Sequence, residues 1–191
     1  MDRKKIAILG FLFVVVVVLA VIFFKSGIKE KILPTLPAPP PEVEPLTQPG
    51  LTRTVVLFFL SEDDTLLHPE EREIPATQSV VREAKQTVEE LIKGSKKGYI
   101  SPFPPEAKLR ELYITPQGVA YVDFTKEIAE NHLSGSSAEI STIFSVVNSL
   151  AYNFDSINKV FILIEGRERE TLGGHINLSR PFLPLYDLIA K

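Results

Sequence analysis

A long run of apolar residues near the N-terminus places the strongest constraint on this chain. It extends from Ile6 to Phe24 and contains no charged, amide or proline residue. As an α-helix it would span roughly 28 Å, which matches the hydrocarbon core of a bilayer at about 30 Å. The valines from Val14 to Val18 would suit a strand in water, but a lone segment in lipid must satisfy its backbone hydrogen bonds internally. The sequence therefore predicts a transmembrane helix over residues 6–24, after a cytoplasmic stub of residues 1–5.

The alternative interpretation of this run is a cleaved signal peptide. Such a peptide has an apolar region of about 7–15 residues and ends in a small-x-small cleavage site. The run here is longer and leads into Lys25, so an uncleaved anchor is favoured. Three basic residues precede the helix and three follow it closely, so the positive-inside count is nearly tied. The short stub is the easier end to keep inside, and we expect the rest of the chain to lie outside the cytoplasm.

Composition excludes several classes of function. The 191 residues include no cysteine, which excludes disulfides, thiol catalysis, cysteine-ligated metals and lipid attachment through cysteine. The first 33 residues carry six basic and two acidic side chains, so the whole-chain charge of −3 leaves −7 on the remainder. An acidic domain disfavours binding to nucleic acid, since neutralising phosphates requires lysine and arginine. A local basic patch remains possible.

A proline-rich segment follows the predicted anchor. Seven of the fifteen prolines fall within residues 34–50, a composition that favours extended polyproline II and resists packing. We interpret residues 25–51 as a stalk that lifts a domain off the bilayer. At about 3.1 Å per residue, its proline-rich part reaches roughly 50 Å at most.

Residues 52–181 are predicted to form a single α+β domain, with residues 182–191 as a C-terminal tail. The pattern of apolar residues and turn signals predicts a buried strand at 54–60, a short edge strand at 66–74 interrupted by Pro69, and a helix at 80–93. It then predicts a hairpin of strands 108–115 and 118–124 joined by a type I turn, a helix from about 137 and a strand at 159–164. The last strand is apolar on both faces, which indicates a central position. The expected architecture is two helices packed on one small mixed or antiparallel sheet.

Four polar residues receive structural interpretations. Ser136 and Glu139 have the spacing of a capping box at the start of the second long helix. Asp123 is placed to cap the short segment 125–130. Asn148 lies close to the apolar stripe of the second helix, and a buried amide needs partners, so we expect it to fix the packing of that helix on the sheet or to contact a ligand.

From Val55 to about Pro181 the sequence resembles the GerMN domain of bacterial sporulation and germination proteins. The segments that carry the resemblance are VVLFFL, SPFPPEAKL, GVAYVDFTKEI, VVNSL and VFILIEGRERETLGGHINLS, in this order. The chain departs from the family's usual pattern at Gly94–Ser95, at Pro104–Pro105–Glu106 and in having no cysteine for a lipid anchor.

The resemblance implies a membrane-tethered protein that acts outside the cytoplasm. Relatives act in spore formation and germination, and they resemble ring-building modules that assemble complexes across the intermembrane space. No active site is associated with the domain, so the resemblance implies a role in assembly or binding.

Motifs for catalysis or metal binding are weak. His68, His132 and His175 lack the spacing of a zinc site. Glu62–Asp64 lacks the pattern of a calcium loop, and Gly173–Gly174 marks a turn without an accompanying nucleophile elbow or phosphate loop. A hydrolase that uses His132 or His175 is the least favoured hypothesis. We expect no enzymatic activity, cofactor or metal.

Two apolar groups either pack onto the domain itself or form a partner surface. One lies in the proline-rich loop and the other in the tail, and aromatic residues are enriched in the cores of interfaces. The candidate surface residues are Tyr99, Ile100, Phe103, Phe182, Leu185 and Tyr186.

These observations favour a non-catalytic, single-pass membrane protein that binds other cell-envelope proteins. The alternative is a module that binds peptidoglycan. Glycan-binding platforms usually expose aromatic rings, and this chain has no tryptophan, which weakens the alternative.

Overall fold

The computed structural model describes residues 50–133 and 135–191. The predicted stub, the transmembrane helix at 6–24 and all but the end of the stalk at 25–51 lie outside these residues. Within the described residues, no helix combines the length and the hydropathy needed to cross a membrane.

The described chain is an α+β domain, as predicted, but its strands form two sheets rather than one. β1 (Thr52–Leu60) and β2 (Leu67–Pro75) form an antiparallel ribbon. The second sheet has the order β3–β4–β5 and contains β3 (Leu109–Ile114), β4 (Val119–Phe124) and β5 (Lys159–Ile164). The pairing of β3 with β4 is antiparallel and that of β4 with β5 is parallel.

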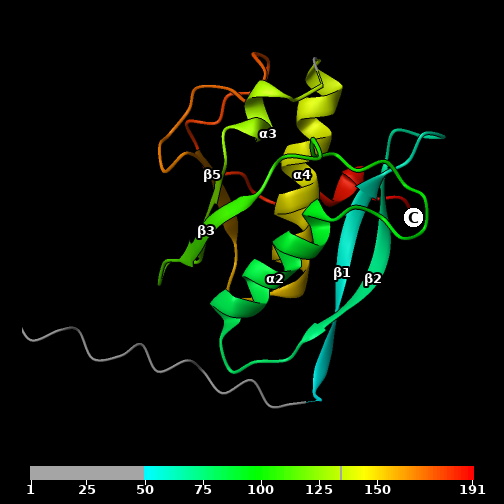
Figure 1. Cartoon of the computed structure of the whole chain (residues 1–191), viewed down its shortest axis with the longest axis vertical. Helices are drawn as coiled ribbons and strands as arrows, with labels where there is room; N and C mark the ends of the chain where they lie inside the picture. Colours follow the sequence, from blue (N-terminus) through cyan, green and yellow to red (C-terminus); the bar gives the residue numbers. More distant parts are fainter. Residues whose placement is uncertain (1–49, 134) are drawn as a thin grey trace, which may run out of the picture. The chain divides into compact units, whose positions relative to one another are not determined.

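Two long helices, α2 (Val80–Ile92) and α4 (Ser136–Asn153), lie between the ribbon and the three-stranded sheet (Figure 1). A four-residue helix, α3 (Glu127–Glu130), and a 3-10 turn at Tyr186–Leu188 complete the elements. One apolar core joins both sheets to both long helices, with Val55, Leu91, Val122, Val147 and Ile162 among its members. The predicted apolar face of the first helix is confirmed, since Ala84, Val88 and Leu91 are buried.

Side chains of α4 explain why the ribbon stays separate from the other sheet. The backbone of Phe58 in β1 donates to the Ser149 hydroxyl (3.1 Å) and accepts from Ser145. The backbone of Val56 exchanges two hydrogen bonds with the Asn153 amide, at 2.9 and 2.7 Å. A sheet edge must pair, be covered or face water. Here a helix takes the place of a neighbouring strand.

The same arrangement corrects the prediction that Pro69 interrupts a short strand. β2 runs for nine residues through Pro69, which lies opposite Phe58. Because the backbone groups of Phe58 turn toward α4, this pair is a non-hydrogen-bonded one, and the ladder does not need an N–H from Pro69.

The β3–β4 hairpin confirms the predicted turn. The Gly118 N–H donates to the Thr115 carbonyl (2.9 Å), and Gly118 has a φ of 77°. A type I turn followed by a left-handed residue is a common three-residue hairpin loop. A Cβ at this position would lie 2.3 Å from the Asn158 amide nitrogen, so glycine is also required by space.

The prediction that residues 159–164 form a central strand is wrong. β4 is central and β5 lies at the edge of its sheet. Its inner face joins the core, while Phe161 on the outer face stacks on Tyr121 with ring centroids 5.3 Å apart. Burial on both faces therefore comes from packing above and below the strand rather than from a strand on each side.

The predicted caps are also wrong. Gly135 is the N-cap of α4 and makes no side-chain bond, while Glu139 turns toward the loop before the tail. α3 likewise has no side-chain cap. Asp123 does not cap α3. Its carboxylate instead accepts hydrogen bonds from the Gly166 N–H (2.8 Å) and from the Arg110 guanidinium (3.1 Å), and neither donor belongs to α3.

Candidate functional site

One of the two predicted partner surfaces lies in the proline-rich loop, at Tyr99, Ile100 and Phe103. Some of these side chains are buried in the core and others are partly exposed. Phe103 is 5% exposed and packs against Phe124, with ring centroids 5.9 Å apart. Ile100 is half-buried and donates its N–H to the Leu60 carbonyl (2.9 Å). Tyr99 is half-buried and packs against His68, with the rings tilted and their centroids 5.2 Å apart. Only Tyr99 and Ile100 therefore retain accessible area.

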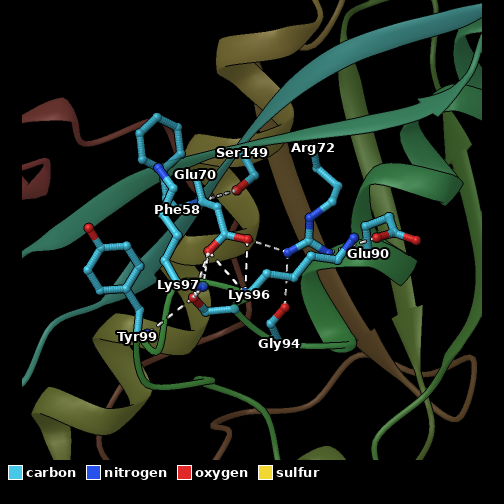
Figure 2. A network of polar contacts seen from close by, with 10 residues as sticks. Phe58, Glu70, Arg72, Glu90, Gly94, Lys96, Lys97, Tyr99 and Ser149 are labelled. Carbon is cyan, nitrogen blue, oxygen red and sulfur yellow. Dashed lines mark hydrogen bonds and ion pairs between the residues drawn. The ribbon is translucent and has the colours of Figure 1, made fainter.

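A buried carboxylate holds the start of this loop in place. Glu70 lies on the inner face of β2, is 2% exposed, and accepts hydrogen bonds from the Ser95 hydroxyl (2.6 Å) and the Lys96 N–H (3.0 Å). The Lys97 N–H lies 3.3 Å from the same carboxylate. Figure 2 shows these bonds converging on Glu70.

Arg72 joins the carboxylate of Glu70 to α2. Its guanidinium donates to Glu70, to Glu90 (2.8 Å) and to the Gly94 carbonyl (3.2 Å), as Figure 2 shows. The side chain is 4% exposed, and its Nε has no protein partner within the described residues. Buried charges persist only when they are paired and hydrogen-bonded. The network thus fixes the loop to both the ribbon and α2.

The environment of Glu70 lowers its pKa. Burial alone would raise it, but hydrogen bonds from Ser95 and Arg72 and from the backbone amides of Lys96 and Lys97 favour the charged form and lower the pKa to about 2. Glu70 is therefore ionised at neutral pH and acts as a fixed structural charge.

The tail is bound to three separate elements by its backbone. Phe182 exchanges two hydrogen bonds with Val160 of β5, at 2.7 and 2.9 Å. The amide of Asn148 in α4 donates to the Leu185 carbonyl (3.0 Å) and accepts from its N–H (2.9 Å). The Ala190 N–H donates to Leu67 of β2 (3.0 Å). The tail therefore crosses from one sheet over α4 to the other.

The role expected for Asn148 changes accordingly. Its side chain is fully buried, as predicted, but it binds the tail rather than fixing α4 on a sheet. The amide supplies one donor and one acceptor to a single residue, as a neighbouring strand would.

Several tail side chains remain exposed although the backbone is fixed. The exposed fraction is 61% for Leu183, 39% for Leu185 and 48% for Tyr186. Tyr152 of α4 is 56% exposed, and with Tyr186 and Ile189 it lines a cleft of about 250 Å³. Phe182 instead packs edge-on against Phe144. We name Tyr152, Leu183, Leu185 and Tyr186 the tail surface.

The histidines make structural contacts. His68 lies within β2, and its Nε2 is 2.8 Å from Asp64. His132 Nε2 is 2.8 Å from the Thr142 hydroxyl. Across residues 50–133 and 135–191, no group of three or more His, Asp or Glu side chains could hold a metal ion.

His175 is oriented by Glu139, which is fully buried. The Glu139 carboxylate accepts from His175 Nδ1 (2.7 Å) and from the N–H groups of His175 (3.0 Å) and Ile176 (2.9 Å). Burial raises the pKa of Glu139, but these bonds outweigh burial and the pKa is lowered. The carboxylate thus holds the loop on α4, and within the described residues it bonds to backbone N–H groups and the His175 ring rather than to a serine or threonine hydroxyl that could act as a nucleophile.

Sequence reasoning missed the inward-facing charges and the polar stripe of α4. Ile74 faces the core, so strand alternation places Arg72 and Glu70 on the same face, a signal present in the sequence. Ser145, Ser149 and Asn153 recur every four residues, which places them on one side of a helix.

Comparison with known proteins identifies the family. The family model described as Germane, sporulation and spore germination, matches residues 56–170. The chain belongs to this family. No curated protein matches the sequence.

Solved structures, among them GerMN domains, share the fold. The first GerMN domain of the sporulation protein GerM from Bacillus subtilis has a TM-score of 0.53 and 22% identity, with 70% of this chain and 98% of that chain covered. The tandem GerMN domains of GerM give 0.58 and 22%, covering 72% of this chain and only 48% of that one. A lipoprotein from Clostridium perfringens gives 0.50 and 24%, covering 69% and 87%. At these identities the likeness concerns the fold alone.

Proposed function

We propose that this chain is a non-catalytic, single-pass membrane protein whose GerMN domain lies outside the cytoplasm. There it binds other envelope proteins and helps to assemble a sporulation or germination complex. The family description supports the process. The membrane location is supported by the apolar run at residues 6–24 and by the description of one structural relative as a lipoprotein.

The tail surface is the observation that carries the proposed protein binding. Leu183, Leu185 and Tyr186 are each at least 39% exposed on a tail backbone that is bound at both ends and at its centre, and Tyr186 lines a cleft together with exposed Tyr152 of α4. Exposed apolar groups on a fixed backbone lose little conformational entropy when a partner covers them. Aromatic side chains of this kind are enriched in interface cores.

Two of the residues predicted for a partner surface contribute little accessible area. Phe103 belongs to the core and Phe182 packs on Phe144. We therefore propose that the interface lies on the tail surface. Of the six residues predicted from the sequence, it includes Leu185 and Tyr186.

Substitution of Tyr186 tests this proposal. Tyr186→Ser should abolish the cross-linked complex formed in cells, while the melting temperature changes by less than about 2 °C because the side chain is about half exposed, at 48%. The matched control is Tyr113→Ser, since Tyr113 on β3 is 46% exposed. The control should keep the complex. Retention of the complex by both variants would contradict an interface at the tail surface.

The aromatic residues on the outer face of the three-stranded sheet favour protein binding over the alternative, peptidoglycan binding. Tyr113 stacks on Tyr121 at 4.9 Å with the rings 7° apart, and Tyr121 stacks on Phe161. Tyr121 thus has a ring stacked on each side and Phe161 is 6% exposed, so these two side chains form no open platform for a glycan. Sedimentation with insoluble peptidoglycan should leave the protein in the supernatant.

A further inference from the structure

A short basic loop stands out on a domain that is otherwise acidic. Residues 93–99, which we name the basic loop, contain three exposed lysines: Lys93, Lys96 and Lys97. The Lys93 ammonium is paired with Glu90 at 2.6 Å. Lys96 and Lys97 form no ion pair with any residue of the described chain. Two positive charges are therefore available to a partner.

The backbone of the basic loop is rigidly anchored. The N–H groups of Lys96 and Lys97 turn inward to Glu70, and those of Lys97 and Tyr99 bind the Ser95 hydroxyl at 3.0 and 3.1 Å. Gly94 and Gly98 have φ values of 87° and 89°, a region that favours glycine. The buried network thus holds the loop in one conformation, with both lysine side chains exposed. Such preorganisation lowers the entropic cost of binding.

The surroundings of the loop favour a small anionic partner over a broad one. Tyr99 packs against His68, and His68 binds Asp64. The acidic turn of residues 62–64 therefore lies beside the loop. A flat anionic bilayer would meet these carboxylates together with the lysines. A short acidic peptide can contact the lysines alone.

We propose that the basic loop is the docking point for a short acidic segment of a partner protein, whose carboxylates pair with Lys96 and Lys97. This inference rests on the proposed role in protein binding, but it uses a different surface. It gives the loop a role in choosing partners, because charge complementarity selects partners and steers their approach.

The test uses the full-length chain in uncharged detergent. The probe is a fluorescently labelled oligoglutamate peptide, with oligoglutamine as the neutral control and fluorescence anisotropy as the readout. The test variant is Lys96→Gln/Lys97→Gln. The matched control is Lys108→Gln/Lys159→Gln, which removes the same charge from exposed positions outside the loop.

Wild-type protein should bind oligoglutamate saturably and lose affinity as the salt concentration rises. The loop variant should bind about fivefold more weakly, and the control should change by less than about twofold.

Equal weakening in both double variants, or no saturable binding by wild type, would overturn the proposal. Loop-dependent binding to phosphatidylglycerol vesicles without binding to oligoglutamate would assign the loop to a membrane instead. Tyr186→Ser should bind oligoglutamate as wild type does. A failure of the basic-loop proposal can therefore be distinguished from a failure of the proposed interface at the tail surface.

Discussion

At the scale of single residues, buried carboxylates organise the loops of this domain. Glu70 binds the basic loop, Glu139 binds the loop before the tail, and Asp123 binds Gly166 after β5. Each supplies acceptors to backbone N–H groups that would otherwise be left without partners. The depressed pKa of Glu70 has a direct consequence for stability, because protonation removes the charge that its hydrogen-bond donors stabilise.

Stability should fall in acid through Glu70. Its pKa drops from an ordinary value of 4.5 to about 2 in the folded state, so its contribution is fully present above about pH 5 and is lost as the pH falls toward 2. The shift corresponds to about 3 kcal/mol of unfolding free energy. Glu70→Gln should remove most of this contribution at neutral pH and flatten the pH dependence in urea unfolding.

The matched control for Glu70 is its neighbour. Glu71 is exposed on the opposite face of β2, so Glu71→Gln should change the unfolding free energy by less than about 0.5 kcal/mol. An unchanged pH dependence in Glu70→Gln would show that Glu70 does not hold the loop.

At the scale of elements, α4 does more than cover a sheet. Its apolar side chains fill the core, and its serines and Asn153 complete the hydrogen bonds at the edge of β1. The helix is therefore the element that separates the ribbon from the other sheet.

Loss of one of these bonds should be costly. Ser149→Ala leaves the buried N–H of Phe58 without its partner, and the expected loss is about 1–3 kcal/mol of unfolding free energy in chemical denaturation. Ser141 provides the comparison, because its hydroxyl donates to the Ser137 carbonyl of the same helix. Ser141→Ala should cost less than about 1 kcal/mol. Equal losses in the two variants would rule out a special role for the β1 edge.

The elements were largely predictable because their signals are local. Apolar periodicity located β1, α2, the hairpin and α4, and the Pro and Gly of residues 115–118 predicted the turn. Sheet membership was not predictable, since it depends on side chains of α4 that lie about 90 positions from β1 in sequence. The capping box failed for a related reason: residues 175 and 176 supply donors to Glu139 that local spacing cannot reveal.

At the scale of the whole molecule, the tail connects parts of the domain that share no strand pairing. It touches β5, α4 and β2 in turn and leaves Leu183 and Tyr186 exposed. Sequence reasoning found apolar residues in the tail and left open whether they pack or present a surface. The structure shows that Phe182 packs while Leu183, Leu185 and Tyr186 are exposed, a division that depends on which contacts the backbone makes.

The central claim is that the tail surface contacts another protein of the cell envelope. Its most direct test is a photo-crosslinking amino acid placed at Leu183 in cells, with the same group at exposed Glu73 of β2 as the control. Leu183 should give one discrete heavier species that disappears when Tyr186→Ser is added, and Glu73 should give none. Absence of a discrete species at Leu183, or the same species at both positions, would contradict the claim.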